Sequence, residues 1–363
     1  SLSVGEKQRV EIVKALSRGA EILILDEPTA VLTPREAEEL GTVLRALRAE
    51  GKGIVLITHR LPEVFAFSDR VMVLRSGVTA LEKRTAETTD AELARAMVGR
   101  PVAASRPGVR RAFGVPVLSV RNLWARNDLG LPALRGVSLA VREGEIAGLA
   151  GVSGNGQREL MEILSGARRA EAGEIVLRER KAAGFSPRQL VESGVGRIPE
   201  DRMETGAILD LSLAENLALE RYHLPPLARR GWRDRRRIRE FAGRLASEYS
   251  IKAHGLEAEA ATLSGGNLQK AILARALDPR PALVLASQPT RGLDLAAAAF
   301  VHGRLRAERE RGAAILLVSE DLEEILALSD TIAVIAAGRI AGVFPREEAD
   351  RGRIGLLMAG GAR

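Results

Sequence analysis

Residues 263–270 read Leu-Ser-Gly-Gly-Asn-Leu-Gln-Lys, and residues 271–277 continue them in a pattern typical of a helix. A serine hydroxyl and the bare N–H groups of two glycines at a helix N-terminus form a site suited to an anion. The same turn is also a common helix entry, because serine and glycine favour turns. The stretch alone leaves both interpretations open, and its second occurrence in the chain decides between them.

The chain opens on a related stretch, Leu-Ser-Val-Gly-Glu in residues 2–6. An offset of 261 residues relates the two stretches, and it also places Pro28-Thr29 on Pro289-Thr290, Ser68-Asp69 on Ser329-Asp330, Gly77 on Gly338 and Met97 on Met358. One offset serves the first hundred residues without a net insertion. This indicates a duplicated domain rather than a short repeat.

The duplication divides the chain into three segments. We interpret residues 1–100 as the C-terminal part of the first copy, residues 101–116 as a proline-containing linker and residues 117–363 as the second copy. Residues 116–262 have no counterpart before Ser1, and a domain without them would lose half of its sheet. Position 1 is also not methionine. We therefore expect an N-terminally truncated piece of a two-domain protein.

Composition excludes several classes of site. The content of hydrophobic residues, 46%, and of charged residues, 28%, is ordinary for a globular protein. The absence of cysteine excludes disulfides, thiolate catalysis and cysteine-ligated zinc, and the four histidines show no metal-ligand spacing. No apolar run reaches the roughly 18 residues that a membrane span requires.

The net charge is +7, and arginine is densest in residues 229–239. Nucleic acid and anionic lipid headgroups are both compatible with such a charge. The run lacks interleaved aromatic residues for stacking on bases, and aromatic residues make up only 3% of the chain. We interpret the run as a solvated helix face and expect no nucleic-acid partner.

In the first copy, two apolar runs end in polar side chains. Residues 21–25 read as a buried parallel strand that ends in Asp26 and Glu27, and residues 54–57 read as a second strand, followed by His59. A helix over residues 34–50 connects them. Strand, helix and strand form a unit with parallel pairing, so all three side chains are expected at one sheet edge, where ligands bind.

The second copy begins with two alternating stretches that predict antiparallel strands. A strand over residues 144–150 then leads into the glycine-rich loop 151–156 and a helix, the context of a phosphate-binding loop. Gln157 and Arg158 stand where that motif requires Lys and then Ser or Thr. The alternative is a purely structural loop. Residues 195–262 predict a mostly helical insertion.

The offset also shows that the second copy has lost the chemistry of the first. Asp26 is replaced by Ser287, Glu27 by Gln288 and His59 by Glu320. The two copies therefore differ at each of these chemically active positions.

These motifs together resemble the ATPase subunits of ATP-binding cassette (ABC) transporters over nearly the whole chain. The resemblance is greatest to the fused double-cassette subunits of bacterial simple-sugar and nucleoside importers, which carry Pro-Glu-Asp-Arg (199–202 here) and Gln-Pro-Thr-Arg-Gly-Leu-Asp (288–294 here). A second glycine loop that ends Gly-Asn-Gly-Gln, 154–157 here, favours the nucleoside branch. The implied fold is an α/β P-loop NTPase cassette with a parallel-sheet core, an antiparallel β subdomain and a helical subdomain, in tandem with an incomplete first copy.

The resemblance implies roles for individual residues. Glu27 would polarise the attacking water, Asp26 would hold Mg²⁺ through water, and His59 would contact the γ-phosphate of ATP. The implied nucleotide-binding residues are Ser264, Gly265, Gly266 and Asn267, then Ser3, Val4 and Gly5, then Gly151, Gly154, Asn155, Gly156, Gln157 and Arg158. The implied hydrolysis site combines the first copy's Asp26, Glu27 and His59 with the second copy's Ser-Gly-Gly loop.

In the second nucleotide site Gln288 stands where the first copy has Glu27, and a neutral amide cannot act as a general base. The loss of a general base typically costs ~10²–10⁴-fold in rate. We expect this site to bind nucleotide weakly and not to hydrolyse it, and we expect the truncated chain alone to be inactive. The implied partners are ATP, membrane permeases at the cytoplasmic face of the cell membrane and, indirectly, a substrate-binding protein. The alternatives are a soluble tandem ATPase acting on ribosomes or nucleic acid, and a non-catalytic fragment. The sequence does not identify the solute.

Overall fold

The structure is a computed structural model that describes residues 10, 14, 19–29, 34–58, 60–75, 77–98, 112–229 and 232–358. The chain divides into two compact units, the first mainly residues 1–104 and the second mainly residues 105–363. Within the described part, no helix combines the length and the apolar character of a membrane span.

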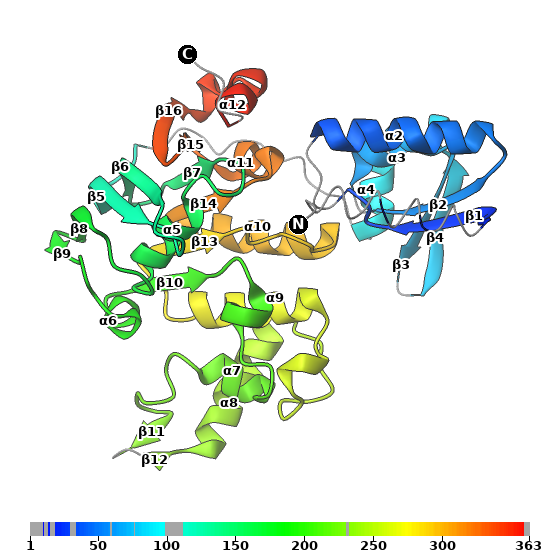
Figure 1. The fold of residues 1–363 in the computed structure, drawn as a ribbon. Helices are drawn as coiled ribbons and strands as arrows, with labels where there is room; N and C mark the ends of the chain where they lie inside the picture. The colour runs from blue at the N-terminus through cyan, green and yellow to red at the C-terminus, as the bar shows by residue number, and fades with distance from the viewer. Residues whose placement is uncertain are drawn as a thin grey trace. The chain divides into compact units, whose positions relative to one another are not determined.

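A six-stranded sheet forms the centre of the second unit (Figure 1). Its strands, in spatial order, are β10 (Val195–Ile198), β13 (Leu283–Ser287), β14 (Ala314–Ser319), β7 (Ile146–Ala150), β15 (Thr331–Ala336) and β16 (Arg339–Pro345). All neighbouring pairs are parallel except β15 and β16, which form an antiparallel hairpin. This confirms the predicted α/β class with a parallel-sheet core.

Both faces of the central strands β13, β14 and β7 are buried, which explains why these strands are almost continuously apolar. Along β13, Val284 and Ala286 belong to one hydrophobic core, and Leu283 and Leu285 belong to the other. The first core is built with α9 (Gly265–Leu277), α10 (Leu295–Glu310), α11 (Leu322–Leu328) and α12 (Arg351–Met358). The second core is built with α5 (Gln157–Leu164) and the antiparallel sheet.

The antiparallel sheet has the order β6-β5-β8-β9. Its strands are β5 (Pro116–Arg126), β6 (Pro132–Arg142), β8 (Ala172–Leu177) and β9 (Arg180–Lys181). The long strands β5 and β6 alternate buried and exposed residues over much of their length, as expected for a sheet with one face on a core. The predicted antiparallel pairing at the start of the second copy is confirmed.

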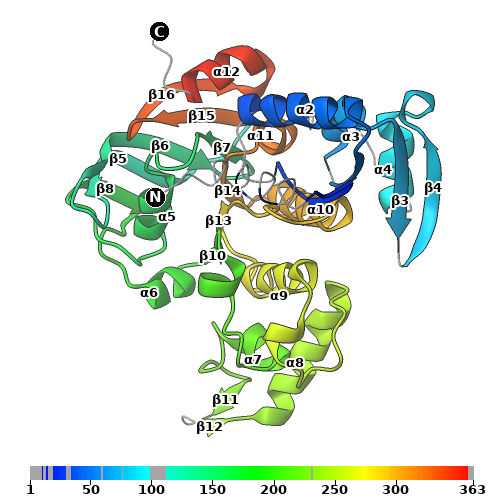
Figure 2. The ribbon, with the colours of Figure 1, turned by 45° about the vertical axis from the view of Figure 1, so that its right-hand side comes forward.

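A helical part lies at one side of the core sheet, beyond α9 (Figures 1 and 2). It contains a π-helical turn (Arg202–Gly206), α7 (Leu213–Ala218), α8 (Arg235–Glu248) and the small hairpin β11 (Ala228–Arg229) and β12 (Trp232–Arg233), and α6 (Pro187–Glu192) precedes β10. One detail of the predicted helical insertion is wrong, because residues 195–198 form the edge strand β10. They pair with β13 and therefore belong to the core sheet.

The first unit contains a parallel pair of strands and an antiparallel pair. Strands β1 (Ile22–Asp26) and β2 (Gly53–Ile57) are parallel and are connected by α2 (Pro34–Ala49), as the sequence predicted. The remaining elements are α3 (Leu61–Phe67), the antiparallel strands β3 (Arg70–Arg75) and β4 (Val78–Arg84), and α4 (Asp90–Val98).

The prediction that the first apolar strand is buried is wrong for one of its faces. Ile22 and Ile24 are both 68% exposed, whereas their counterparts at the 261-residue offset, Leu283 and Leu285, are at most 2% exposed. In the second unit these positions pack in the core that contains Leu149 of β7 and residues of α5. The described residues of the first unit contain no element equivalent to β7 or α5, so this face of the strand pair has no cover.

Because of this difference in burial, truncating the side chains at these matched positions should change the free energy of unfolding by different amounts. Leu285→Ala removes a fully buried side chain and should lower the free energy of unfolding by about 2–5 kcal/mol. Ile24→Ala removes an exposed side chain and should change it by at most ~0.5 kcal/mol. Urea denaturation followed by far-UV circular dichroism measures both, and equal losses would contradict the assigned exposure of β1.

Candidate functional site

The parallel register of the second unit brings three loops to one edge of the sheet. Ser287, the last residue of β13, pairs with Val318 of β14, and Ser319 pairs with Ala150 at the end of β7. The glycine loop follows directly after β7, and Glu320 follows directly after β14. Ser287, Gln288, Glu320 and the glycine loop therefore meet at the carboxyl edge, where open α/β sheets bind ligands.

The glycine loop closes on its own polar side chains. The amide Nε2 of Gln157 donates to the carbonyl of Val152 over 2.9 Å, and Nδ2 of Asn155 donates to the same carbonyl over 3.1 Å. Oδ1 of Asn155 accepts from the backbone N–H of Ala337 over 2.7 Å, which joins the loop to the turn between β15 and β16. Gln157 is buried and therefore stabilises the loop instead of pointing into solvent.

Two glycines of this loop have packing reasons to be glycine. A Cβ at Gly151 would lie 2.6 Å from Nε2 of Gln157, and a Cβ at Gly156 would lie 2.5 Å from the carbonyl oxygen of Ala133. Gly156 also has a φ of 102°, in the left-handed region. Gly154, with a φ of 85°, has nothing within 4 Å of a built Cβ. Backbone conformation therefore also favours glycine at Gly154, although this residue faces open space.

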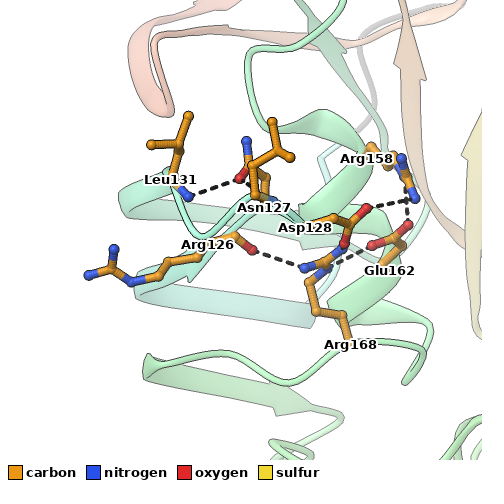
Figure 3. A network of polar contacts seen from close by, with 8 residues as sticks. Arg126, Asn127, Asp128, Leu131, Arg158, Glu162 and Arg168 are labelled. Atoms are coloured by element: carbon orange, nitrogen blue, oxygen red, sulfur yellow. Dashed lines mark hydrogen bonds and ion pairs between the residues drawn. The ribbon is translucent and has the colours of Figure 1, made fainter.

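Arg158, the next residue, is bound to carboxylates of its own unit (Figure 3). Its Nε lies 2.7 Å from Oε1 of Glu162, one helical turn further along α5, and its Nη2 lies 3.3 Å from Oδ2 of Asp128 in the loop between β5 and β6. Arg168 bonds to the same two carboxylates and donates to the carbonyl of Arg126 over 3.0 Å. The network therefore connects the start of α5 to the β5–β6 hairpin.

The pairing shifts the pKa of both Asp128 and Arg158 toward their charged forms. The hydrogen bond from Arg168 lowers the pKa of Asp128 below its usual range, and the hydrogen bond to Glu162 raises the pKa of Arg158. Both groups are charged at neutral pH and each stabilises the charge of the other. The guanidinium of Arg158 is thus already neutralised by the protein itself.

The backbone at Glu27 has the same conformation as the backbone at Gln288, the matched position of the second unit. Glu27 has a φ of 43° and Gln288 has a φ of 47°, the left-handed region that few residues other than glycine adopt. The N–H of Glu27 donates to the carbonyl of Ile57, and the N–H of Gln288 donates to that of Val318, each over 2.8 Å. The second unit has therefore kept the strained turn and changed only the side chain, and such strain is found mostly at functional sites.

Glu320 places a carboxylate beside the glycine loop. Its burial raises its pKa, while Arg291 and a hydrogen bond with Ser153 of the loop oppose that shift. Oε1 of Gln288 accepts from the backbone N–H of Glu320 over 3.2 Å, and this hydrogen bond links the loop after β13 to the loop after β14. A carboxylate at this position opposes the binding of a phosphate, whereas a histidine would favour it.

The Ser-Gly-Gly stretch begins α9 as predicted. Ser264 is the N-cap residue, and its side chain makes no capping hydrogen bond to the helix backbone. Its Oγ instead accepts from Nδ2 of Asn267 over 2.9 Å. Arg202 lies against Gly265 and donates to the carbonyl of Gly292 over 3.2 Å, so a cation lies beside the start of this helix.

In the first unit, Asp26 ends β1 and pairs with Ile57 of β2, and both Asp26 and Glu27 are exposed at the carboxyl edge of the strand pair. His59, the predicted third member of this site, lies outside the described residues, and so do Ser3, Val4 and Gly5, which were predicted to bind nucleotide at the second site.

Sequence reasoning missed a buried carboxylate that, in each unit, accepts a hydrogen bond from the threonine in the loop after the first strand of the pair. Glu63 accepts from the hydroxyls of Thr29 and Thr58, and its counterpart Glu324 accepts from Thr290 over 2.6 Å. Glu324 also lies 3.0 Å from Nε2 of His302. The signal was available in the sequence, because the offset of 261 residues carries Thr29 and Glu63 onto Thr290 and Glu324.

Comparison with known proteins gives a consistent result. Residues 1–30 and 134–291 match a family model described as ABC transporter. The chain is 43% identical over 360 residues to a nucleoside import ATP-binding protein of Lactococcus lactis, 45% identical over 362 residues to a glucose import ATP-binding protein of Haloferax volcanii, and 44% identical over 360 residues to a guanosine import ATP-binding protein of Bacillus subtilis. Each match covers 99% of this chain and, in that order, 71%, 66% and 70% of the relative.

Solved structures show the same fold. A nucleotide-free ATP-binding cassette from an ABC transporter matches with a TM-score of 0.55 at 20% identity, over 64% of this chain and 92% of that chain. A dimeric post-hydrolysis cassette bound to ADP and phosphate matches with a TM-score of 0.54 at 22% identity, over 63% of this chain and 98% of that chain.

The position of Glu320 predicts a pH-dependent affinity for nucleotide in the second unit. Because burial raises the pKa of Glu320, the carboxyl group takes up a proton at a higher pH than usual as the pH falls, and repulsion of the phosphates then disappears. Glu320→Gln should raise the affinity for ATP about fivefold at neutral pH, corresponding to ~1 kcal/mol for one charge pair. Fluorescent-nucleotide titration across pH measures this. An equal pH dependence in the variant would contradict the assignment.

Because Glu324 is buried and hydrogen-bonded, replacing it should lower the stability of the protein more than replacing its neighbour Glu323. Glu324→Ala leaves Thr290 and His302 without their acceptor and should lower the free energy of unfolding by about 1–3 kcal/mol. The control is Glu323→Ala, because Glu323 is 61% exposed and should contribute at most ~1 kcal/mol through its surface ion pair with Arg351. Urea denaturation followed by tryptophan fluorescence distinguishes them, since both tryptophans of the chain belong to the second unit.

Proposed function

Since the chain belongs to the ABC transporter family of ATPases, we propose that it is the ATP-binding subunit of an importer, coupling ATP hydrolysis to uptake of a sugar or a nucleoside. The observation that carries this proposal is the identity of 43–45% over 99% of the chain to ATP-binding proteins named for the import of nucleosides, glucose and guanosine. The Gly-Asn-Gly-Gln ending of the second glycine loop favours a nucleoside.

The proposal assigns hydrolysis to the Asp26–Glu27 pair. The left-handed turn at Glu27 presents the carboxylate at the end of β1, where it would orient and polarise the attacking water. The buried Glu63, bonded to Thr29 and Thr58, holds the loops after β1 and β2 in a fixed relation. Phosphoryl transfer depends mainly on such positioning and on charge neutralisation. His59 would contact the γ-phosphate, and Ser264, Gly265 and Gly266 would supply further phosphate contacts.

The residues of the first unit fit a magnesium ion that arrives with the nucleotide. Mg²⁺ prefers oxygen ligands and usually keeps several waters, bound through one or two carboxylates and the substrate phosphates. Asp26 is an exposed carboxylate at the sheet edge and would hold the ion through water. The ion would neutralise charge on the phosphates. Ser287 and Gln288, at the matched positions of the second unit, offer no carboxylate and do not fit the ion.

We propose that the second unit binds nucleotide weakly and does not hydrolyse it. Three features support this: the amide of Gln157 closes the glycine loop, Arg158 is paired with Glu162 and Asp128, and Glu320 adds a carboxylate. In this proposal the unit keeps its Ser-Gly-Gly loop and its framework while its own site is inactive.

The membrane partner would contact a cavity of about 660 Å³ in the second unit. The cavity lies between α6, residues 219–224 after α7, and residues 278–280 after α9. Leu190, Leu219 and Leu224 give it an apolar wall, and paired charges such as Arg221 with Asp278 at 2.7 Å line its rim. We assign this cavity to a cytoplasmic segment of the permease, with the ATPase peripheral at the cytoplasmic face of the membrane.

The test compares matched positions of the two units in the transport complex purified from membranes. Glu27→Gln removes the proposed base and should lower the kcat for ATP hydrolysis by about 10²–10⁴-fold. Gln288→Ala, at the same turn of the second unit, should leave kcat within about twofold, because the proposal gives that residue no chemical role. Comparable losses of kcat in both variants would contradict the proposal that the first unit supplies the hydrolytic residues and the second does not.

A second test restores the missing phosphate contacts. The double variant Gln157→Lys, Arg158→Thr supplies the cation and hydroxyl that the phosphate-binding motif requires, and should raise the affinity of the second unit for ATP at least about tenfold. Isothermal titration of the purified chain measures the change. The control is Arg188→Gln, at an exposed arginine of α6 that is paired with Glu192 and should leave the affinity unchanged.

A further inference from the structure

The hairpin β11–β12 presents a tryptophan to solvent at the end of the helical part. Trp232 is 83% exposed, more than any other large apolar side chain in the described residues. It pairs with Arg229 across the hairpin, which projects beyond α7 and α8 on the side away from the core sheet (Figures 1 and 2). Tryptophan combines a large apolar ring with an N–H donor, and such side chains are enriched at interfaces and in membrane-interface belts.

The tryptophan lies among arginines that outnumber the acidic residues near them. Residues 229–239 contain seven arginines and one aspartate. Arg236 is paired with Glu240 at 2.9 Å, and Arg239 is paired with Glu257 at 2.6 Å. Four other exposed arginines form no ion pair among the described residues, namely Arg229, Arg233, Arg235 and Arg237. The pKa of Glu215, lowered mainly by its hydrogen bonds with Ser212, is lowered further by the nearby charges of Arg233 and Arg235.

The start of α8 makes this charge cluster costly to the protein alone. Its first turn holds Arg235, Arg236 and Arg237 and no acidic residue. The N-terminus of a helix carries a partial positive charge, so arginines there are unfavourable and anions are favourable. Asp234 caps the helix by accepting from the N–H of Arg237 over 3.1 Å, and it is the only acid in the run. An external anionic surface would offset the remaining repulsion.

We propose that the hairpin β11–β12 and the first turn of α8 form a contact surface for the anionic lipid headgroups of a membrane. Arginines near such a surface are attracted to it, and an exposed tryptophan is the side chain that partitions to the membrane–water interface. A single tryptophan does not form the series of stacking platforms that single-stranded nucleic acid uses, which favours lipid over RNA. The hairpin follows residues 219–224, which line the cavity assigned to the permease, so both surfaces belong to one stretch of chain. Binding to vesicles needs no permease. A negative result with vesicles would therefore contradict the lipid-contact surface and leave the assignment of the cavity to the permease unaffected.

The experiment uses the purified chain and vesicles of two compositions, phosphatidylcholine alone and equal parts of phosphatidylcholine and phosphatidylglycerol. In the variant Trp124→Phe, Trp232 is the only tryptophan. Its emission should shift to the blue with the anionic vesicles and not with the neutral ones, and added salt should reverse the shift. The variant Trp232→Phe, which retains Trp124, should show no shift.

Matched arginine variants identify the surface. Arg233→Gln with Arg237→Gln removes two unpaired charges and should weaken binding to the anionic vesicles about 25-fold, at about fivefold for each arginine. Arg236→Gln with Glu240→Gln removes an ion pair of the same region without changing the net charge and should weaken binding much less. Cosedimentation measures both, and circular dichroism verifies that each variant is folded.

Three outcomes would overturn the proposal. The first is equal binding to neutral and anionic vesicles, and the second is an equal loss in the Arg233/Arg237 variant and in the charge-neutral Arg236/Glu240 variant. The third is tighter binding of a single-stranded RNA oligonucleotide than of anionic vesicles through Arg233 and Arg237, which would reassign the surface to nucleic acid.

Discussion

The parallel register of β13, β14 and β7 is the constraint on which the second unit depends. Because these strands run in one direction and pair in register, the chain must return through a helix after each of them, and every loop that follows a strand lies at the same edge. The alternating residues of β13 contribute to two separate cores. Burial of both faces thus fixes the sheet, and the fixed sheet brings the glycine loop, Gln288 and Glu320 together.

The two copies share parts of a backbone framework although their side chains differ at the matched positions. Glu27 and Gln288 share an unusual left-handed turn and the same hydrogen bond to the neighbouring strand. The buried carboxylates Glu63 and Glu324 likewise accept a hydrogen bond from the matched threonines, Thr29 and Thr290. A buried carboxylate is costly to change, because its threonine partner would be left without an acceptor. Stability therefore preserves the framework independently of any catalytic role.

Much of the fold followed from patterns in the sequence, and the failures have physical causes. The apolar strands, the loop after β7 and the helix after the Ser-Gly-Gly stretch were predicted from local composition. The pairing of Arg158 with Asp128 was not predicted, because Asp128 lies on a hairpin that only the packing of the antiparallel sheet brings to α5. The exposure of Ile24 was not predicted either, because an apolar strand pattern does not state whether a second layer covers it. The membership of the family was predicted from motifs and confirmed by comparison.

The sequence by itself determined the duplication, the order of strands and loops, and the loss of chemical groups in the second copy. Each of these depends on residue identity and on spacing along the chain, which a fixed offset of 261 residues makes directly comparable. Only the tertiary structure decided which charges are neutralised, which arginines around Trp232 lack a partner, and which strand face is uncovered. These depend on distances through space between residues far apart in sequence, and burial and Coulomb attraction act only through such distances.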